Sequence, residues 1–236
     1  AQVSLLKAFQ VRNQIIPARY ILRVRVQSRM STIELTYFTG VKARGEPTKI
    51  ALHASGVPWK DCSVDFAAFK EAKAAGKYPT GLPELRTASG KVFTQSIAMA
   101  RYAAKLGSSG LYPTDPEAAL AVDVVMDTCQ DALTKCPQDA DPDVKKAKRE
   151  EYAAGRLKAY MDELSKTIEQ SGGPFFAGDT LTIADLVAKY FLLDMITSGN
   201  FDYVAPEYVN DWPLLVAMDK ATSEHAVVKA YEASKG

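Results

Sequence analysis

The sequence is poor in the residues that build metal sites and disulfide frameworks. It has three cysteines, Cys62, Cys129 and Cys136, and two histidines among 236 residues. Three cysteines cannot all pair and their spacing fits no zinc site, so a reducing compartment is favoured over a disulfide-stapled fold. His53 and His225 lie far apart in helical stretches, and we assign neither as a ligand or base. We therefore expect no metal.

Long apolar runs and a strong net charge are also absent. No hydrophobic run reaches the length that a bilayer requires, so we expect no stable membrane insertion. The net charge of +1 argues against a general nucleic-acid binder. The chain has no glycine-rich phosphate loop and no nucleophile elbow. Its 236 residues, of ordinary composition, suit a globular protein of one large or two small domains.

Acidic residues are missing from residues 1–29. This segment holds six Lys or Arg and no Asp or Glu, so it carries a charge of +6 and the remainder −5. Two interpretations stay open: a transit peptide, or a translated leader ahead of a natural start at Met30. A membrane-binding amphipathic arm is a third, weaker interpretation. We expect a cytoplasmic protein, or one imported into an organelle if the transit peptide is real.

The remaining chain is organised around residues 78–102. Leu82-Pro83 precedes a hairpin with a serine-glycine turn, and a helix is predicted to open at Gln95-Ser96. A helix N-terminus attracts anions, so Ser96 either caps its own helix or lines an anion site together with Gln95. Because Pro83 cannot donate to a strand ladder, the backbone of Leu82 is predicted to be free for a ligand.

The segments before this stretch alternate between strand and helix patterns. Residues 32–38 read as a first strand, residues 44–55 as a helix closed by Gly56, and residues 57–66 as a second strand. Residues 66–77 read as a connector. The order strand, helix, strand, hairpin, helix predicts a thioredoxin-like α/β unit with a right-handed crossover.

The second half reads as helical throughout. We predict an α/β domain at residues 30–106, a linker dense in breakers at residues 107–116, and an all-helical domain at residues 117–236. Within the last, Thr182 and Asp185 have the spacing of a capping box. That signal indicates a folding role rather than chemistry.

The Leu-Pro step, the hairpin, Gln95-Ser96 and the following Ile-Ala-x-Ala-Arg-Tyr run resemble the glutathione-site core of cytosolic glutathione transferases. Similar spacing of further motifs extends from about Ile33 to the C-terminus. The resemblance implies a thioredoxin-like domain followed by an all-α domain. It also implies that Gln95 and Ser96 hold the γ-glutamyl end of glutathione, and that Leu82, before a cis Pro83, pairs with the cysteinyl backbone.

Tyr37-Phe38, followed by Ala43-Arg44-Gly45-Glu46, resembles the tyrosine-type transferases, and the sigma class above all. A strand-end tyrosine by itself usually serves packing. The resemblance instead implies that Tyr37 is catalytic and that Arg44 belongs to the glutathione site. A phenol bonded to a thiolate stabilises the charged form, and a thiol pKa shift of about two units corresponds to roughly 2.7 kcal/mol.

Further glutathione contacts follow from the same resemblance. Sigma-like members use a tryptophan and a lysine at the glycine end of glutathione; Phe69 stands at the tryptophan position here, and Lys73 matches the lysine. Asp123, Asp127 and Asp131 repeat every four residues, which fits a solvated acidic stripe. The resemblance implies that Asp131 reaches across a homodimer to the γ-glutamyl amine.

The resemblance thus implies a homodimeric glutathione transferase that activates the glutathione thiol, as co-substrate, toward hydrophobic electrophiles. Peroxidase or isomerase side activities are compatible with it. We expect the second substrate between the loop after Phe38 and the helix containing Met126. The replacement at Phe69 keeps a non-catalytic hydrophobic-ligand carrier open as an alternative, and a structural interaction module is a third.

Overall fold

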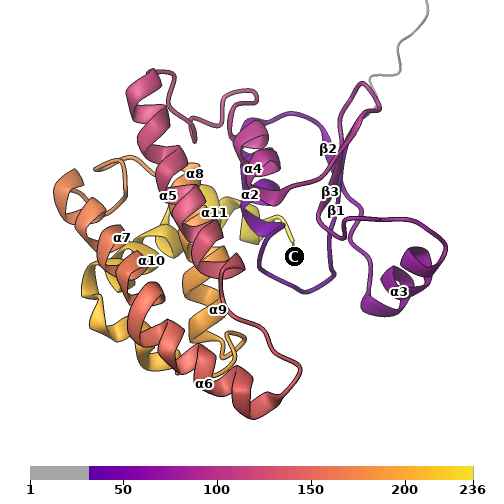
Figure 1. Ribbon diagram of the computed structural model, residues 1–236. Coiled ribbons are helices and arrows are strands. Elements are labelled where there is room, and N and C mark those ends of the chain that lie inside the picture. The colour runs from indigo at the N-terminus through magenta and orange to yellow at the C-terminus, as the bar shows by residue number, and fades with distance from the viewer. Residues whose placement is uncertain (1–31, 236) are drawn as a thin grey trace, which may run out of the picture.

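The computed structural model describes residues 32–235, drawn in colour in Figure 1. The basic segment at residues 1–29 and its proposed leader or transit role lie outside the described residues. No helix between residues 32 and 235 has both the length and the apolar character needed to cross a membrane.

The first part is a four-stranded sheet with the strand order β2-β1-β3-β4. Its strands are short: β1 (Ile33–Thr36), β2 (Trp59–Asp61), β3 (Glu84–Arg86) and β4 (Val92–Phe93). β1 pairs with β2 in parallel and with β3 antiparallel. A parallel pair needs a crossover, which α2 (Glu46–Ser55) supplies, and β3 and β4 form the predicted hairpin. This is the thioredoxin-like order expected from the sequence.

Two helices, α2 and α4 (Ser96–Ala104), pack against each other between the sheet and the second domain, as Figure 1 shows. Small side chains such as Ala100 and Ala103, both fully buried, let the helices approach closely. Gly107, just after α4, is required by the same contact. A Cβ there would lie 2.0 Å from the backbone oxygen of Ser55.

One helix was missed by the sequence interpretation. Residues 66–77, predicted as a connector, begin with α3 (Phe66–Ala74), and the second predicted strand is correspondingly shorter. Asp65 caps the helix by accepting a hydrogen bond from the Ala68 N–H at 2.7 Å. α3 buries no residue, so it lacks the apolar stripe that would have identified it.

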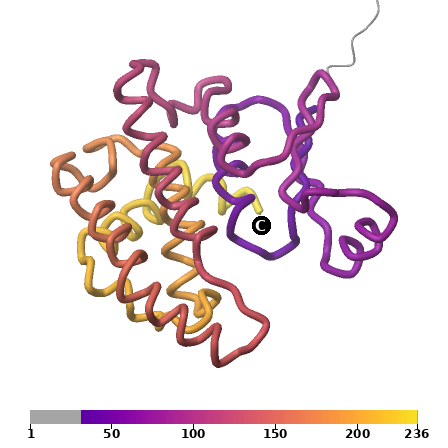
Figure 2. The backbone as a smooth tube through the Cα atoms, viewed as in Figure 1, coloured from indigo at the N-terminus to yellow at the C-terminus, as the bar shows by residue number. Residues whose placement is uncertain are grey.

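The second part is helical, as predicted. Its α-helices are α5 (Pro116–Thr134), α6 (Pro142–Tyr152), α7 (Lys158–Ser171), α8 (Ile183–Val187), α9 (Asp194–Thr197), α10 (Pro213–Glu224) and α11 (Ala226–Ala233). π-helical η1 (Ala153–Leu157) joins α6 to α7, η2 (Ala188–Leu193) joins α8 to α9, and η3 (Pro206–Asp211) is a 3-10 helix. In Figure 2 the yellow C-terminal end returns to the indigo N-terminal part, where α11 contacts α2.

The predicted capping box is confirmed at the start of α8. Thr182 accepts from the Ala184 N–H at 3.3 Å, and Asp185 accepts from the Thr182 N–H at 2.7 Å. Asp185 also accepts from the Phe176 N–H at 2.9 Å. Both capping residues are buried, so these bonds satisfy backbone donors that water cannot reach.

Replacing Thr182 with alanine should lower the free energy of unfolding by about 1 kcal/mol, because a buried helix N-terminus loses its cap. Urea unfolding measures this change. Thr180→Ala is the matched control, since Thr180 is exposed and its side chain caps nothing. Equal stabilities for the two variants would contradict a stabilising role for the box.

Candidate functional site

Tyr37 follows β1 directly and is held from one side by the loop that leads to α2. Its side chain is only 4% exposed. Gly45 packs against the ring so closely that an added Cβ would lie 2.5 Å from Tyr37 Cδ1. The backbone N–H of Arg44 donates a hydrogen bond to the phenol oxygen. The loop therefore fixes both the ring and its hydroxyl.

Burial raises the pKa of the Tyr37 phenol above its ordinary value. The hydrogen bond and the positive charge of Arg44 act in the opposite direction, and the negative charge of Glu46 adds to the rise. Because the net shift is upward, the phenol is neutral at physiological pH. It can therefore donate a hydrogen bond to an anionic group placed beside it.

Arg44 connects this loop to the helical domain. Its Nη1 donates to Gln130 Oε1 on α5 at 3.1 Å, and its guanidinium carbon lies 5.8 Å from the ring centroid of Phe191 in η2. Burial lowers its pKa, yet an arginine keeps its charge under protein conditions. Arg44 thus brings a fixed positive charge to the junction of the two domains.

A small cavity of about 100 Å³ lies where the Leu82-Pro83 step meets the start of α4. It is lined by Arg44, Thr80, Leu82, Pro83, Thr94, Gln95 and Ser96. The structure therefore brings together most of the residues predicted to bind glutathione, and it adds Thr80 and Thr94, which the sequence interpretation missed. Thr80 and Thr94 lie within two positions of predicted site residues in the sequence, and no other sequence signal pointed to them.

The backbone around this cavity has two features suited to a ligand. The peptide bond Leu82–Pro83 is cis. Pairing of β3 with β1 begins only at Glu84, so the backbone of Leu82 stands outside the ladder. Both features match the sequence prediction for this step.

The N-terminus of α4 also borders the cavity. No side chain caps this helix, so Ser96, its first residue, does not serve as the cap that the alternative interpretation assumed. Gln95 holds φ at 77°, a region that non-glycine residues seldom occupy, and such strain gathers at functional sites. Uncapped N–H groups and a buried serine hydroxyl leave hydrogen-bond donors available for an anion.

Phe69 and Lys73 lie apart from this cavity, on α3. The Phe69 ring packs edge-on against Phe38 with 4.9 Å between centroids, and Lys73 Nζ lies 5.8 Å from the centre of the Phe69 ring. Phe66 stacks on Phe38 at 4.5 Å, and Phe38 in turn lies 5.3 Å from the Tyr37 ring. This aromatic cluster was not predicted, although Phe66 and Phe69 have helical spacing.

The repeating aspartates of α5, Asp123, Asp127 and Asp131, are not simply solvated. Arg101 Nε on α4 donates to Asp123 at 2.7 Å, and its Nη2 lies 3.8 Å from Asp127. Arg101 is therefore a counter-ion that sequence periodicity could not locate. Asp131 pairs with Lys135, the residue directly after α5, and does not line the cavity of the same subunit.

A second cavity, of about 520 Å³, lies on the other side of the loop after Phe38. Residues 40–43 form one wall, and the other comes from Asp194, Met195, Thr197, Ser198 and Asn200. α9 therefore faces the loop here, and α5, the helix containing Met126, meets it through the bond between Arg44 and Gln130. Met126 is fully buried in the core and lines no such opening.

Neither histidine takes part in these features. His53 packs edge-on against Tyr231, and His225 caps α11 by accepting from the Val227 N–H at 3.3 Å. Among residues 32–235, no group of three or more His, Cys, Asp or Glu side chains could hold a metal ion.

A thioredoxin-like sheet followed by an all-helical domain, with a donor-rich cavity at the start of α4, is the glutathione transferase fold. The sequence profile described as "Glutathione S-transferase, C-terminal domain" matches residues 126–235. The chain is thus similar to glutathione S-transferases, through this match to its helical half and through relatives aligned over most of its length.

Individual relatives agree with this assignment. Glutathione S-transferase 3 of Caenorhabditis elegans is 29% identical over 178 residues, which are 72% of this chain and 83% of that protein. The prostaglandin synthase D structure of Nilaparvata lugens superposes with a TM-score of 0.71 at 23% identity, covering 87% of this chain and 98% of that one. A glutathione transferase homolog from Sulfitobacter with bound glutathione has a TM-score of 0.66 at 18% identity, covering 86% and 98%.

Gly45→Ala should displace the Tyr37 ring, because its Cβ would overlap the ring carbons. We expect a loss of about 1–3 kcal/mol in the free energy of unfolding, the usual effect of overpacking. Gly155→Ala is the control, since nothing lies within 4 Å of its added Cβ. Chemical denaturation compares the two, and an undiminished stability for Gly45→Ala would refute the tight packing of loop on ring.

Proposed function

We propose that the protein is a glutathione transferase that activates the glutathione thiol for attack on hydrophobic electrophiles. One observation carries the proposal: a buried, neutral Tyr37 phenol is fixed by Arg44, which also lines the donor-rich cavity of Gln95 and Ser96. Similarity to glutathione S-transferases supports glutathione as the co-substrate. So does the Sulfitobacter homolog, which was solved with glutathione bound.

Different residues would bind different parts of glutathione. The γ-glutamyl carboxylate would lie at the N-terminus of α4, where the helix dipole and the donors of Gln95 and Ser96 favour an anion. The free backbone of Leu82, beside Pro83, would pair with the cysteinyl backbone. Lys73 would pair with the glycine carboxylate, while Phe69 contributes packing in place of an indole donor.

In the proposed chemical step, the glutathione sulfur lies beside the Tyr37 phenol. Tyr37 donates a hydrogen bond to the sulfur, which favours the thiolate and lowers the thiol pKa as its proton passes to solvent. The thiolate forms a bond to the electrophilic carbon, and the leaving group departs with its electron pair. The same thiolate could reduce a peroxide or assist an isomerisation, the latter suggested by the prostaglandin synthase among the similar structures.

The proposal includes a homodimer. A groove of about 510 Å³ lies between the β3–β4 hairpin and α4, and exposed Phe93 and Tyr102 line it. Further exposed apolar side chains occur on β4 and α5, so that five belong to β4, α4 and α5 together. They are Val92, Phe93, Tyr102, Leu120 and Val124. An apolar groove with exposed aromatic side chains suits a self-complementary contact between two copies. Asp131, on α5, would then be offered to the γ-glutamyl amine bound by the partner.

Tyr37→Phe should lower kcat/KM for conjugation of a generic aryl halide by about one to two orders of magnitude, the usual effect of losing one preorganised donor. Glutathione affinity, measured by calorimetry, should stay nearly unchanged because the cavity at α4 is intact. Tyr203→Phe is the control, since Tyr203 is exposed and distant in sequence from the site.

An unchanged rate in Tyr37→Phe would discard the catalytic assignment. Wild-type protein that binds glutathione without turning over any electrophile would instead favour the carrier. Failure to bind glutathione at all would favour a structural interaction module.

Asp131→Asn should raise KM for glutathione about tenfold, because a charged partner of the γ-glutamyl amine is lost, and should leave the dimer intact in sedimentation. Asp179→Asn is the control, since Asp179 is exposed and has no ion-pair partner among residues 32–235. A monomeric wild-type protein, or an unaltered KM, would remove Asp131 from the site.

A further inference from the structure

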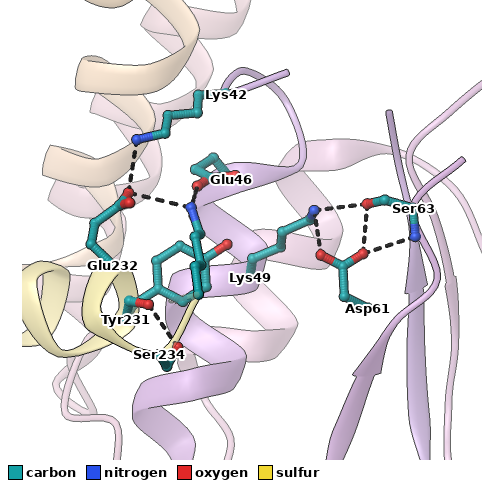
Figure 3. A network of polar contacts seen from close by, with 9 residues as sticks. Lys42, Glu46, Lys49, Asp61, Ser63, Tyr231, Glu232 and Ser234 are labelled. Atoms are coloured by element: carbon teal, nitrogen blue, oxygen red, sulfur yellow. Dashed lines mark hydrogen bonds and ion pairs between the residues drawn. The ribbon is translucent and has the colours of Figure 1, made fainter. Parts of the chain in front are cut away.

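The C-terminal end of the chain reaches the loop that follows Tyr37, as Figure 3 shows in close-up. Lys235 Nζ donates to Glu46 Oε1 at 2.6 Å, and Lys42 Nζ donates to Glu232 Oε1 at 3.0 Å. Lys235 also lies 3.3 Å from Glu232 Oε1, so the four charges form one continuous chain. Two residues of the loop region are thus tied to one turn at the end of α11.

Glu46 is the buried member of this chain. Its side chain is only 3% exposed, whereas that of Lys235 is 37% exposed. A buried carboxylate is costly unless it is paired and hydrogen-bonded. Lys235 supplies the charge, and the Tyr231 hydroxyl supplies a further hydrogen bond. Moving Glu46 away from Lys235 and Tyr231 would leave its buried carboxylate unpaired, so these contacts fix its position.

The position of Glu46 sets the position of the groups that touch the phenol. Glu46 is the first residue of α2, and it follows directly on Arg44 and Gly45. Gly45 packs on the Tyr37 ring, and Arg44 bonds the phenol oxygen through its backbone. A shift of Glu46 must therefore move at least one of these contacts, because only one peptide unit separates it from Gly45.

The other side of α2 is held independently. Lys49 Nζ donates to Asp61 Oδ2 at 2.6 Å and to Ser63 Oγ at 2.8 Å, next to β2. A cavity of about 500 Å³ is lined both by this group and by the Glu46–Lys235 pair. Loss of the Lys235 contact would therefore loosen the loop while leaving α2 attached to the sheet.

We propose that the Glu46–Lys235 and Lys42–Glu232 pairs form a clamp by which the C-terminal end of the chain holds the loop over Tyr37. Glu46 and Lys235 are positioning residues, since they touch the phenol only through Arg44 and Gly45. The chemical consequence rests on the proposed function, because it concerns the glutathione thiol. The geometric consequence, a loop ordered by α11, does not.

The test compares Lys235→Met with Lys235→Arg, which keeps the charge, and with Lys229→Met as control. Lys229 is exposed on α11, the helix that precedes Lys235, and has no ion-pair partner among residues 32–235. In Lys235→Met the amides of residues 39–46 should exchange with deuterium about tenfold faster, while those of β1 and α5 keep their rates. Lys235→Arg and Lys229→Met should exchange as the wild type does.

Kinetic measurements distinguish a misplaced Tyr37 phenol from general destabilisation of the protein. A poorly placed phenol stabilises the thiolate less, so Lys235→Met should raise the thiol pKa by about one unit. The rate should then fall about tenfold near pH 6.5 and recover near pH 9, where the thiolate forms without help. Lys235→Arg should restore the wild-type profile.

The proposal is overturned by unchanged exchange at residues 39–46 in Lys235→Met. It is equally overturned by a rate that falls uniformly at every pH, which would indicate general destabilisation. If the wild type does not turn over glutathione, the proposed function fails, and the exchange comparison alone still decides whether the clamp exists.

Discussion

The structure depends on one local arrangement: a buried phenol at the end of the first strand, held by the backbone of the next loop. Burial keeps the Tyr37 hydroxyl protonated, and the Arg44 N–H fixes its direction. A phenol in water would be neutral too, but it would lack a defined position. The proposed catalysis by hydrogen-bond donation requires preorganisation, so under that proposal the packing of Gly45 against the ring is as important as the hydroxyl itself.

The two domains meet at this arrangement, and each supplies part of it. The sheet supplies the phenol and, through α4, the donor-rich cavity. The helical domain fixes Arg44 through Gln130 and Phe191. The same domain reaches Glu46 through Lys235, so the loop between them is held at several points. A bound tripeptide would thus find its partners already in place, which lowers the entropy cost of binding.

Local signals predicted much of this from the sequence. The hairpin, the start of α4 at Ser96 and the capping box of Thr182 each depend on residues within a few positions of one another, so their patterns are readable. The cavity residues around Pro83 followed from the family resemblance rather than from spacing.

Contacts between distant segments could not be predicted in this way. Glu46 and Lys235 are 189 residues apart, and Arg101 faces Asp123 from another helix, so no periodicity links them. α3 was not predicted because it buries no residue and so has no apolar stripe. α9 was not expected to face the loop because four residues are too few to show a helical periodicity.

The pKa of the glutathione thiol, measured on the bound tripeptide by ultraviolet difference titration of wild type and Tyr37→Phe, tests the central claim most directly. We expect the wild type to hold this pKa about two units below that of free glutathione, and the variant to lose most of that shift. A bound thiol that titrates at the same pH in both proteins, or with the pKa of free glutathione in the wild type, would contradict the account.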